Sequence, residues 1–552
     1  MNQLGSARSA YLKSAAHQPV HWREWSDEAF AAANASGRPV LLDIGAVWCH
    51  WCHVMDGESY EDPQLAEYLN QHFVCIKVDR DERPDVDARY QRAVQAITGQ
   101  GGWPLTAFLT PDGEIFYGGT YFPPDERYGR PGFRTVLEQV IHFWTNQRPR
   151  AVEQSKALRH ALATRTDPVA AGRVTPSMLL AAERQILAGF DPAFGGFGSA
   201  PKFPHPGAIR FLMARWADGG SSHTAHVARE TLLAMARGGI CDQLGGGFHR
   251  YSVDRQWVIP HFEKMSYDNS ELLTVYVEGA MLFEPGAEEF RATARGIVAW
   301  VREVLAPADA GYGTSQDADV GPNDDGNYFT WTLDEMADAL DRDELEVTSR
   351  RFGLGTSGAM PHDPERNVLF QARTIEELAQ VTGRPVEQVA QLVASAIRKL
   401  REARNRRPAP TVDSSRYASW NAMMAGAMLR AAPVLDDDWA RSHALRTLVM
   451  LAGGNNADPA LLPDRPAVPL AHARGVEGLL EDQVHAADAA IDAFEATAEP
   501  GWLSWAASLM EHAWESHRAP GSEGLFDLAV GRGGAGLLNQ GIRSIEDAPV
   551  PS

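Results

Sequence analysis

Two cysteines three positions apart constrain this chain more than any other feature. Cys49-His50-Trp51-Cys52 follows an apolar run at 40–45 and precedes a segment with helical character up to about residue 58. At the start of a helix, free backbone N–H groups and the macrodipole favour a thiolate. The spacing also lets Cys52 reach a mixed disulfide formed on Cys49. We therefore predict a redox-active dithiol in which Cys49 attacks, Cys52 resolves, and a protonated His50 lowers the pKa of Cys49.

The elements around the motif form a recognisable order. We predict helices at 26–36, from the motif to about 58, at 85–97 and at 134–147, and strands at 40–45, 73–79, 105–110 and 115–121. The order β-α-β-α-β-β-α is that of a thioredoxin fold. Such folds place a cis-proline opposite the dithiol, before the third central strand, where Trp103-Pro104 stands. We expect Pro104 to be cis and to shape the docking groove; a trans proline in a surface loop is the alternative.

The rest of the chain has a different pattern. Amphipathic helices alternate with Gly- and Pro-rich loops, at 176–189, 207–217, 223–237, 268–283, 287–305, 386–405, 419–434, 438–452 and 480–496. Because no fixed-length repeat is evident, an all-α (α/α) toroid is favoured over a regular solenoid. We therefore expect a thioredoxin-like domain with an N-terminal extension at 1–165 and a six-hairpin barrel-like domain at 166–552.

Two other interpretations of the cysteine motif were weighed. Cys49-His50-Trp51-Cys52-His53 satisfies C-x-x-C-H, the haem attachment pattern, but that function needs export and a small helical domain. The four donors could also bind a metal, although neighbouring side chains on a helix point apart and would need a ligand from elsewhere. We therefore expect neither a metal nor a cofactor. Cys75 and Cys241 are expected to be inert core thiols.

The charge and composition of the chain limit the classes of partner that it is expected to bind. The 552 residues carry a formal net charge of −21, which disfavours nucleic acids and anionic membranes as partners. No apolar run approaches the roughly 20 residues that span a bilayer. The N-terminus lacks the apolar core of a secretory signal, so we expect a cytoplasmic protein.

Several longer strings resemble one known family. The dithiol segment, 73–80 and 99–106 are similar to the YyaL-like, or spermatogenesis-associated protein, family, as are 201–204, 245–251, 260–265 and 267–269. The resemblance implies a thioredoxin-like domain followed by a six-hairpin (α/α)6 barrel, similar to N-acylglucosamine 2-epimerases and certain glycoside hydrolases. It becomes patchy after about Trp331.

The chain departs from that family pattern at several places. Asp317-Ala318-Asp319 is not followed by the usual Ser-Glu-Gly, Asp413-Ser414-Ser415 stands where Asp-Asp-Lys is typical, and His21 replaces an Asp. Relatives typically continue beyond the last residue of this chain. We therefore expect either an incomplete barrel or a shortened end, and the departures put the chemistry of the barrel in doubt.

Candidate binding residues gather before the expected inner helices of the barrel. Carboxylates, histidines and aromatic rings at one end of a toroid suit a carbohydrate. The candidates are His249, His261, Glu263, Lys264, Asp268, Asp317, Asp319 and Trp420. Each has a structural alternative: Glu263-Lys264 as a solvated ion pair, Asp268 as a helix N-cap, 317–325 as an exposed acidic loop, and Trp420 as a packing residue.

Three functions follow from these patterns. The first is thiol–disulfide exchange, with a barrel that recognises a protein dithiol or disulfide or a small molecule such as a sugar. The second is a carbohydrate-active isomerase or hydrolase with a structural thioredoxin-like domain. The third is a non-catalytic binding scaffold. Whether the chain is an enzyme is therefore left open by the sequence.

Overall fold

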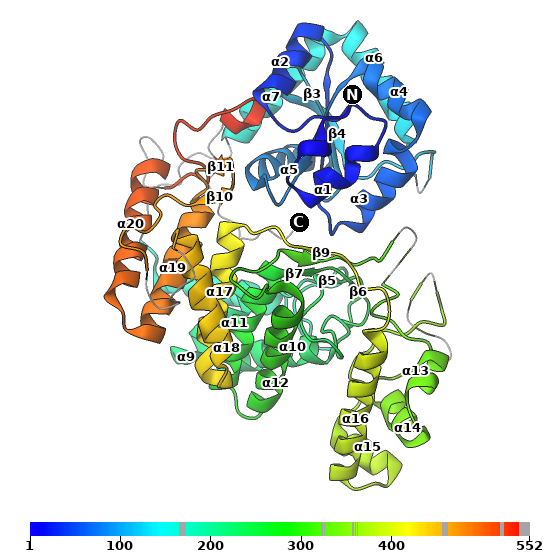
Figure 1. The fold of residues 1–552 in the computed structure, drawn as a ribbon, viewed down its shortest axis with the longest axis vertical. Coiled ribbons are helices and arrows are strands. Elements are labelled where there is room, and N and C mark those ends of the chain that lie inside the picture. The colour runs from blue at the N-terminus through cyan, green and yellow to red at the C-terminus, as the bar shows by residue number, and fades with distance from the viewer. Residues whose placement is uncertain are drawn as a thin grey trace.

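The chain folds into a sheet-containing N-terminal domain and a larger helical domain beneath it (Figure 1). The structure is a computed structural model. It describes residues 1–552 except 128, 165–172, 322, 323, 325, 356, 357, 359, 362, 455–461, 519–523, 540, 541 and 543–552. The expected domain boundary between residues 165 and 166 lies outside the described residues. Among those described, no helix is long and apolar enough to cross a lipid bilayer.

A four-stranded sheet forms the core of the first domain. Its order is β2-β1-β3-β4, with β1 at Val40–Gly45, β2 at Val74–Asp79, β3 at Leu105–Leu109 and β4 at Ile115–Gly119. β1 runs parallel to β2 and antiparallel to β3, and β4 is antiparallel to β3. β1 and β2 are buried along their full length, which explains their nearly continuous apolar sequence. This topology confirms the thioredoxin-like fold.

Helices cover both faces of the sheet. Their bounds are α1 Ala10–Ser14, α2 Asp27–Ser36, α3 His50–Met55, α4 Pro63–His72, α5 Pro84–Thr98, α6 Phe133–Asn146 and α7 Arg148–Thr164. Side chains alternate along β1, so Leu41 packs with Cys75 and Phe108 on one face while Leu42 packs on the other. The first face carries α1, α3, α4 and α6, and the second α2 and α5. α1, α4 and α7 were not anticipated from the sequence.

Four helical hairpins form the barrel within the described residues. They pair α9 Pro206–Ala217 with α10 Ser222–Arg237, α11 Ser266–Leu282 with α12 Ala287–Trp300, α17 Ala418–Leu435 with α18 Asp438–Leu451, and α19 Leu480–Thr497 with α20 Pro500–His517. α8, Pro176–Ala188, packs beside α9 and α10. The first helix of each hairpin contacts its counterparts in neighbouring hairpins, which makes an inner layer. α11 and α17 are buried on nearly all sides, so the expected helical barrel is confirmed.

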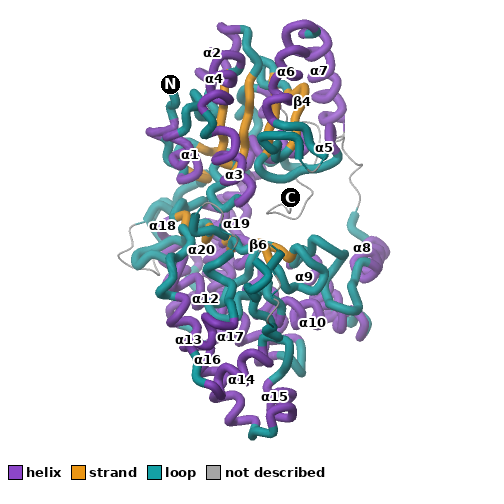
Figure 2. The backbone as a smooth tube through the Cα atoms, turned by 90° about the vertical axis from the view of Figure 1, so that its right-hand side faces the viewer, coloured by secondary structure: helices purple, strands orange, loops and turns teal. Residues whose placement is uncertain are grey.

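A small helical bundle stands apart from the barrel. It contains α13 Leu333–Ala339, α14 Arg342–Arg351, α15 Ile375–Thr382 and α16 Val386–Arg404, and it projects away from both domains in Figures 1 and 2. It has two apolar clusters, one that contains Met336 and Leu400 together with Leu244 of the barrel, and one that contains Val347 and Val389. The segment 386–405 is the predicted helix, but it belongs to this bundle and not to a barrel hairpin.

Short strands line the barrel end that faces the thioredoxin-like domain (Figure 1). β5 Tyr251–Ser252 pairs with β6 Pro260–His261, and β7 Lys264–Met265, β8 Ser315–Gln316 and β9 Val412–Asp413 form a three-stranded sheet. β7 leads directly into α11, and β9 leads into α17 after a short loop. The N-terminal ends of the inner helices therefore point towards the first domain. A hairpin of β10 Ala471–Ala473 and β11 Val476–Glu477 precedes α19.

The two domains share apolar contacts at two places. Met265, Tyr267, Tyr417 and Trp420 of the barrel belong to the same core cluster as Cys49 and Cys52. On the other side of the sheet, Leu528, Leu537 and Leu538 from the end of the described chain pack beside α5. The dithiol face of the first domain is thus in contact with the barrel and is not turned to solvent.

Candidate functional site

The two motif cysteines form a disulfide at the start of α3. Cys49 is the N-cap of the helix, and its Sγ accepts a hydrogen bond of 3.2 Å from the backbone N–H of Cys52. The Cα atoms are 5.2 Å apart. Cys49 is 6% exposed and Cys52 1% exposed. An N-cap sulfur lies at the positive end of the helix, which stabilises the thiolate that a reduced Cys49 would form.

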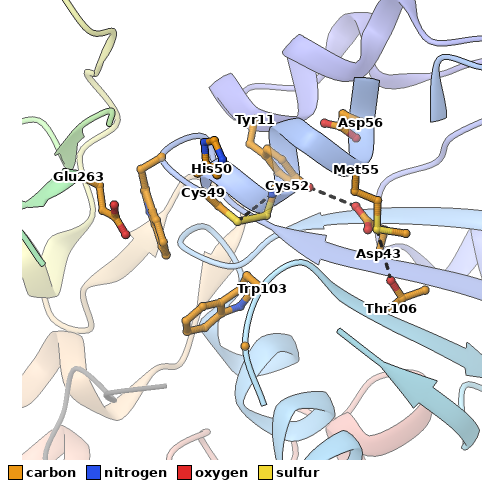
Figure 3. Close-up of a disulfide and its surroundings, with 12 residues drawn as sticks. Tyr11, Asp43, Cys49, His50, Cys52, Met55, Asp56, Trp103, Thr106 and Glu263 are labelled. Carbon is orange, nitrogen blue, oxygen red and sulfur yellow. Dashed lines mark hydrogen bonds between the residues drawn. A yellow bond between two sulfur atoms is a disulfide. The ribbon is translucent and has the colours of Figure 1, made fainter. Parts of the chain in front are cut away.

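Two tryptophans flank the disulfide. Trp48 precedes Cys49, and Trp103 precedes Pro104 through a cis peptide bond, as predicted. Their rings meet edge to face at a centroid distance of 5.8 Å. Trp48 Nε1 donates to Asp81 Oδ2 at 2.7 Å, and Trp103 Nε1 donates to Asp87 Oδ1 at 2.8 Å. Figure 3 shows Trp103 beside the sulfur pair. Both indole rings are therefore held in fixed positions around the dithiol.

A buried charge network lies behind the dithiol. Lys77 of β2 donates to Asp43 of β1 at 2.7 Å and to Asp56 at 2.9 Å, and Asp43 also accepts from Tyr11 Oη at 3.1 Å. Burial raises the pKa of Asp43, against the lowering effect of the Lys77 charge. A Cβ placed on Gly45 would lie 2.8 Å from Cys52 Sγ and would overlap Tyr11 Oη. Glycine at this position lets Tyr11 of the network approach Cys52 closely.

Barrel residues reach the same site from the opposite side. Asp319 Oδ2 lies 2.6 Å from His50 Nδ1, next to Cys49. The guanidinium of Arg250 lies 4.4 Å from the ring centre of Trp48 and 5.2 Å from that of Trp103. Arg80 stacks over Trp103 at 4.5 Å from the side of the first domain. Both buried arginines therefore make cation–π contacts with the tryptophan pair.

Two predicted carboxylates, Asp268 and Glu263, interact with the charge of Arg250, and a third, Asp317, interacts with Glu263. Burial raises the pKa of Asp268 to about 7, and burial together with the charge of Asp319 raises that of Asp317 to about 8. Burial also acts to raise the pKa of Glu263, but His261 and Arg250 together outweigh it, and the net shift is downward. His261 Nδ1 lies 3.6 Å from Glu263 Oε2. The interpretation of 317–325 as an exposed loop is wrong for Asp317 and Asp319, which are buried. The interpretation of Asp268 as an N-cap is also wrong, because Met265 is the N-cap of α11.

The remaining predicted residues lie in packed surroundings. Lys264 is buried and donates to Asp242 Oδ2 at 2.7 Å, so it is not in a solvated pair with Glu263. Burial lowers the pKa of Lys264 to about 8, and burial with the Lys264 charge lowers that of His249 to about 3. His249 Nδ1 contacts the Phe262 carbonyl at 2.7 Å. Trp420 packs edge to face on Tyr267 at 4.6 Å.

Two clusters in the described residues have donor atoms suited to a metal ion. His53, Asp317 and Asp319 bring one ligand atom each within 4.8 Å of one another, as do His472, Glu481 and Asp482. Burial lowers the pKa of His53, which favours the neutral imidazole that coordinates metals. Asp317 and Asp319 of the first cluster are ligands from a distant part of the chain, which a metal at the cysteine motif would need. The sulfur atoms of Cys49 and Cys52 are bonded to each other in this structure, so they are not offered to a metal here.

Arg80 and Arg250 were not among the predicted site residues. Both occur within strings that carry the family resemblance, at the ends of 73–80 and in 245–251. Their place between the tryptophans could not be inferred, because the contact joins distant parts of the chain. The available signal in the sequence was Arg80, a charged residue directly after the buried strand β2.

Comparisons with known proteins agree with this division. The Thioredox_DsbH family, described as a protein of unknown function, DUF255, matches residues 1–163. Spermatogenesis-associated protein 20 of Homo sapiens is 35% identical over 549 residues, covering 92% of this chain and 69% of the human protein.

Two solved structures each align with part of the chain. A sugar epimerase from a ruminal bacterium aligns with 15% identity and a TM-score of 0.27, covering 63% of this chain and 89% of its own. A structure titled DsbH Oxidoreductase aligns with 18% identity and a TM-score of 0.17, covering 22% of this chain and 81% of its own.

Proposed function

This chain belongs to the family of spermatogenesis-associated protein 20, and we propose that it exchanges disulfides through Cys49 and Cys52. The observation that carries the proposal is the disulfide at the N-terminus of α3, with Trp103 beside it. A cysteine pair with only a packing role would need neither a capping sulfur nor a charge network behind it. The barrel serves to bring the substrate to the dithiol, and a carbohydrate or a glycosylated molecule is among the candidates.

The exchange uses the two sulfurs in sequence. The thiolate of reduced Cys49 attacks one sulfur of a substrate disulfide, which forms a mixed disulfide and releases the other sulfur as a thiolate. Cys52 then attacks Cys49 Sγ, closes the protein disulfide and releases the second substrate thiol. Cys49 takes the first role because its sulfur caps α3 and is the more exposed of the two.

The buried network supports the second step. Cys52 is almost fully buried, so its thiol needs a proton acceptor before it can attack. Asp43 has a raised pKa and is linked to Tyr11, and a Cβ on Gly45 would contact both Tyr11 and Cys52. Asp43 is therefore suited to receive that proton through Tyr11 or a water molecule, while Lys77 holds the carboxylate in place.

Trapping of the mixed disulfide tests the proposal. In the full-length chain, Cys52→Ser should retain a covalent adduct after incubation with glutathione disulfide, detected as a mass increase by intact-protein mass spectrometry. Cys49→Ser is the matched variant and should retain none at Cys52 under the same conditions. Failure of the wild-type pair to equilibrate with any glutathione redox buffer would contradict the proposal.

Carbohydrate chemistry in the barrel is a second proposal, favoured by one pair of carboxyl groups. The pKa of Asp268 is raised to about 7 while that of Glu263 is lowered, which suits an acid and a base acting together. Turnover of a monosaccharide or disaccharide panel should then disappear in Asp268→Asn and Glu263→Gln and persist in Cys49→Ser. A sugar that binds without any turnover would instead favour a binding scaffold.

A further inference from the structure

The barrel covers the side of the dithiol from which a partner would approach. Trp48 and Trp103 precede the nucleophile and the cis-proline, and both face Arg250 of the barrel. His50 is in contact with Asp319, also from the barrel. Figure 3 shows Glu263 on the barrel ribbon, facing the motif. An extended protein segment that docked on this surface would have to displace these contacts.

Charged atoms without hydrogen-bond partners are buried at this boundary. Among the residues that the structure describes, Glu263 Oε2, Asp268 Oδ2 and Arg80 Nη1 have no such partner. Glu263 and Arg80 are more than nine-tenths buried, and the unpartnered oxygen of the partly exposed Asp268 is itself buried. Unsatisfied buried polar atoms are rare and costly in native proteins, so a polar ligand or ordered water is expected here.

The charges indicate the chemistry of that ligand. Arg80 and Arg250 both lie against the tryptophan pair, and the charges of both act on Asp268, with that of Arg250 also acting on Glu263. Guanidinium groups bind carboxylates, while carboxylates accept hydrogen bonds from ammonium or hydroxyl groups. A small molecule that carries both kinds of group would satisfy both sets.

We propose that the partner of Cys49 is a low-molecular-weight disulfide with carboxylate and ammonium or hydroxyl groups, held by Arg250, Glu263 and Asp268 beside the two tryptophans. This inference rests on the proposed exchange function and names its substrate class. A protein disulfide is the alternative that the covered surface disfavours. The half-buried His50 and His261 lie beside these groups and mark where such a molecule would enter.

Electrons and protons balance between the Cys49–Cys52 dithiol and the substrate disulfide, written RSSR. The reduced protein and one molecule RSSR give the mixed disulfide Cys49–S–S–R and one thiolate RS⁻. Attack by the Cys52 thiolate then breaks that bond, forms the Cys49–Cys52 disulfide and releases a second RS⁻. The dithiol loses two electrons and RSSR gains them, and the two protons of the thiols pass to the released thiolates.

The test compares disulfides of different size and charge on the full-length reduced protein. Glutathione disulfide carries carboxylates and ammonium groups, bis(2-hydroxyethyl) disulfide lacks both, and insulin is a protein disulfide. Each rate is divided by the rate of the same disulfide with free dithiothreitol. Glutathione disulfide is expected to be about tenfold faster than either of the others on this scale.

Arg250→Lys should remove most of the advantage of glutathione disulfide and leave bis(2-hydroxyethyl) disulfide unchanged, because the planar guanidinium is lost. Arg255→Lys is the matched control, since Arg255 pairs with Asp191 away from the dithiol. Asp268→Asn provides a second readout if Arg250→Lys fails to fold.

Oxidation by insulin that outpaces glutathione disulfide, with no effect of Arg250→Lys, would overturn the inference but leave the exchange function intact. No oxidation by any of the three would overturn the exchange function itself.

Discussion

His50 and Asp319 join the two domains at the cysteine motif. Nδ1 of His50, the residue after Cys49, lies 2.6 Å from Oδ2 of Asp319 in the loop after β8. Asp319 is buried and His50 is partly exposed, so the pair is shielded more than a surface ion pair. The contact means that access to Cys49 depends on the position of the barrel as well as on the thioredoxin-like domain.

Loss of this contact should make the disulfide easier to reach. Asp319→Asn keeps the shape of the side chain and removes its charge, so the barrel is held less firmly over Cys49. We expect the disulfide to be reduced about fivefold faster by a phosphine reductant in stopped-flow measurements. Asp309→Asn, on an exposed barrel loop, is the control and should react at the wild-type rate. Equal rates for Asp319→Asn and wild type would show that the pair does not control access.

The contact between His472 and the first domain should depend on pH. His472 Nε2 lies 2.9 Å from the Asp81 carbonyl, and its Nδ1 lies 2.9 Å from Asp482 Oδ1. Burial alone would lower the pKa of His472, but Asp482 outweighs it and raises the pKa from 6.5 to about 9. The stabilisation is therefore complete below about pH 6.5 and is lost as the pH rises through about 9.

Urea unfolding at a series of pH values checks this expectation. As the pH rises from about 6.5 to about 9, the free energy of unfolding should fall by up to about 3 kcal/mol more in wild type than in His472→Gln. His142→Gln, at an exposed position on α6, should follow the wild-type curve. Parallel curves for wild type and His472→Gln would contradict the assigned charge.

Gly45 should be intolerant of a side chain. A Cβ there would overlap Tyr11 Oη and crowd Cys52 Sγ, both of which are held by packing. Gly45→Ala is expected to lower the free energy of unfolding by about 1–3 kcal/mol. Gly57→Ala is the matched control, because nothing lies within 4 Å of its added Cβ, and it should lose no stability. Denaturant titrations of both variants in the oxidised state make the comparison.

Lys77 should be essential to the fold because it neutralises two buried carboxylates. Lys77→Met leaves Asp43 and Asp56 without their cation and should cost about 3–5 kcal/mol of unfolding free energy. The double variant Lys77→Met/Asp43→Asn should recover part of the loss, since one uncompensated charge is removed. Lys156→Met, on the exposed surface of α7, should be neutral in the same chemical denaturation assay. Equal losses in the single and double variants would rule out this account.

Local chemistry allowed the first domain to be predicted closely. Val40 to Gly45 form a strand because their apolar run suits a position inside the sheet, and Ser26 begins the predicted helix at 26–36 as the N-cap of α2 by accepting from the backbone N–H of Ala29. The place of Pro104 follows from its position before β3, and its cis bond is confirmed. The dithiol at the strand–helix junction was predicted on the same grounds.

In the second domain, the helical periodicity of the sequence predicted where helices begin and end but not which helices pack against each other. The predicted segments at 419–434 and 438–452 match α17 and α18 within about two residues. The periodicity of 386–405 is just as clear, yet this helix packs against α13, α14 and α15 outside the barrel. An amphipathic pattern reports that one face is buried and does not specify what covers it.

The sequence by itself therefore determined which segments become strands and helices and which two sulfurs meet, since those outcomes depend on neighbours a few positions apart. Only the tertiary structure decided that Arg250 lies against Trp48 and Trp103, that Asp317 and Asp319 are buried, and that the barrel faces the dithiol. Burial and the resulting pKa shifts depend on solvent exclusion by distant segments, and a local pattern carries no record of which segments those are.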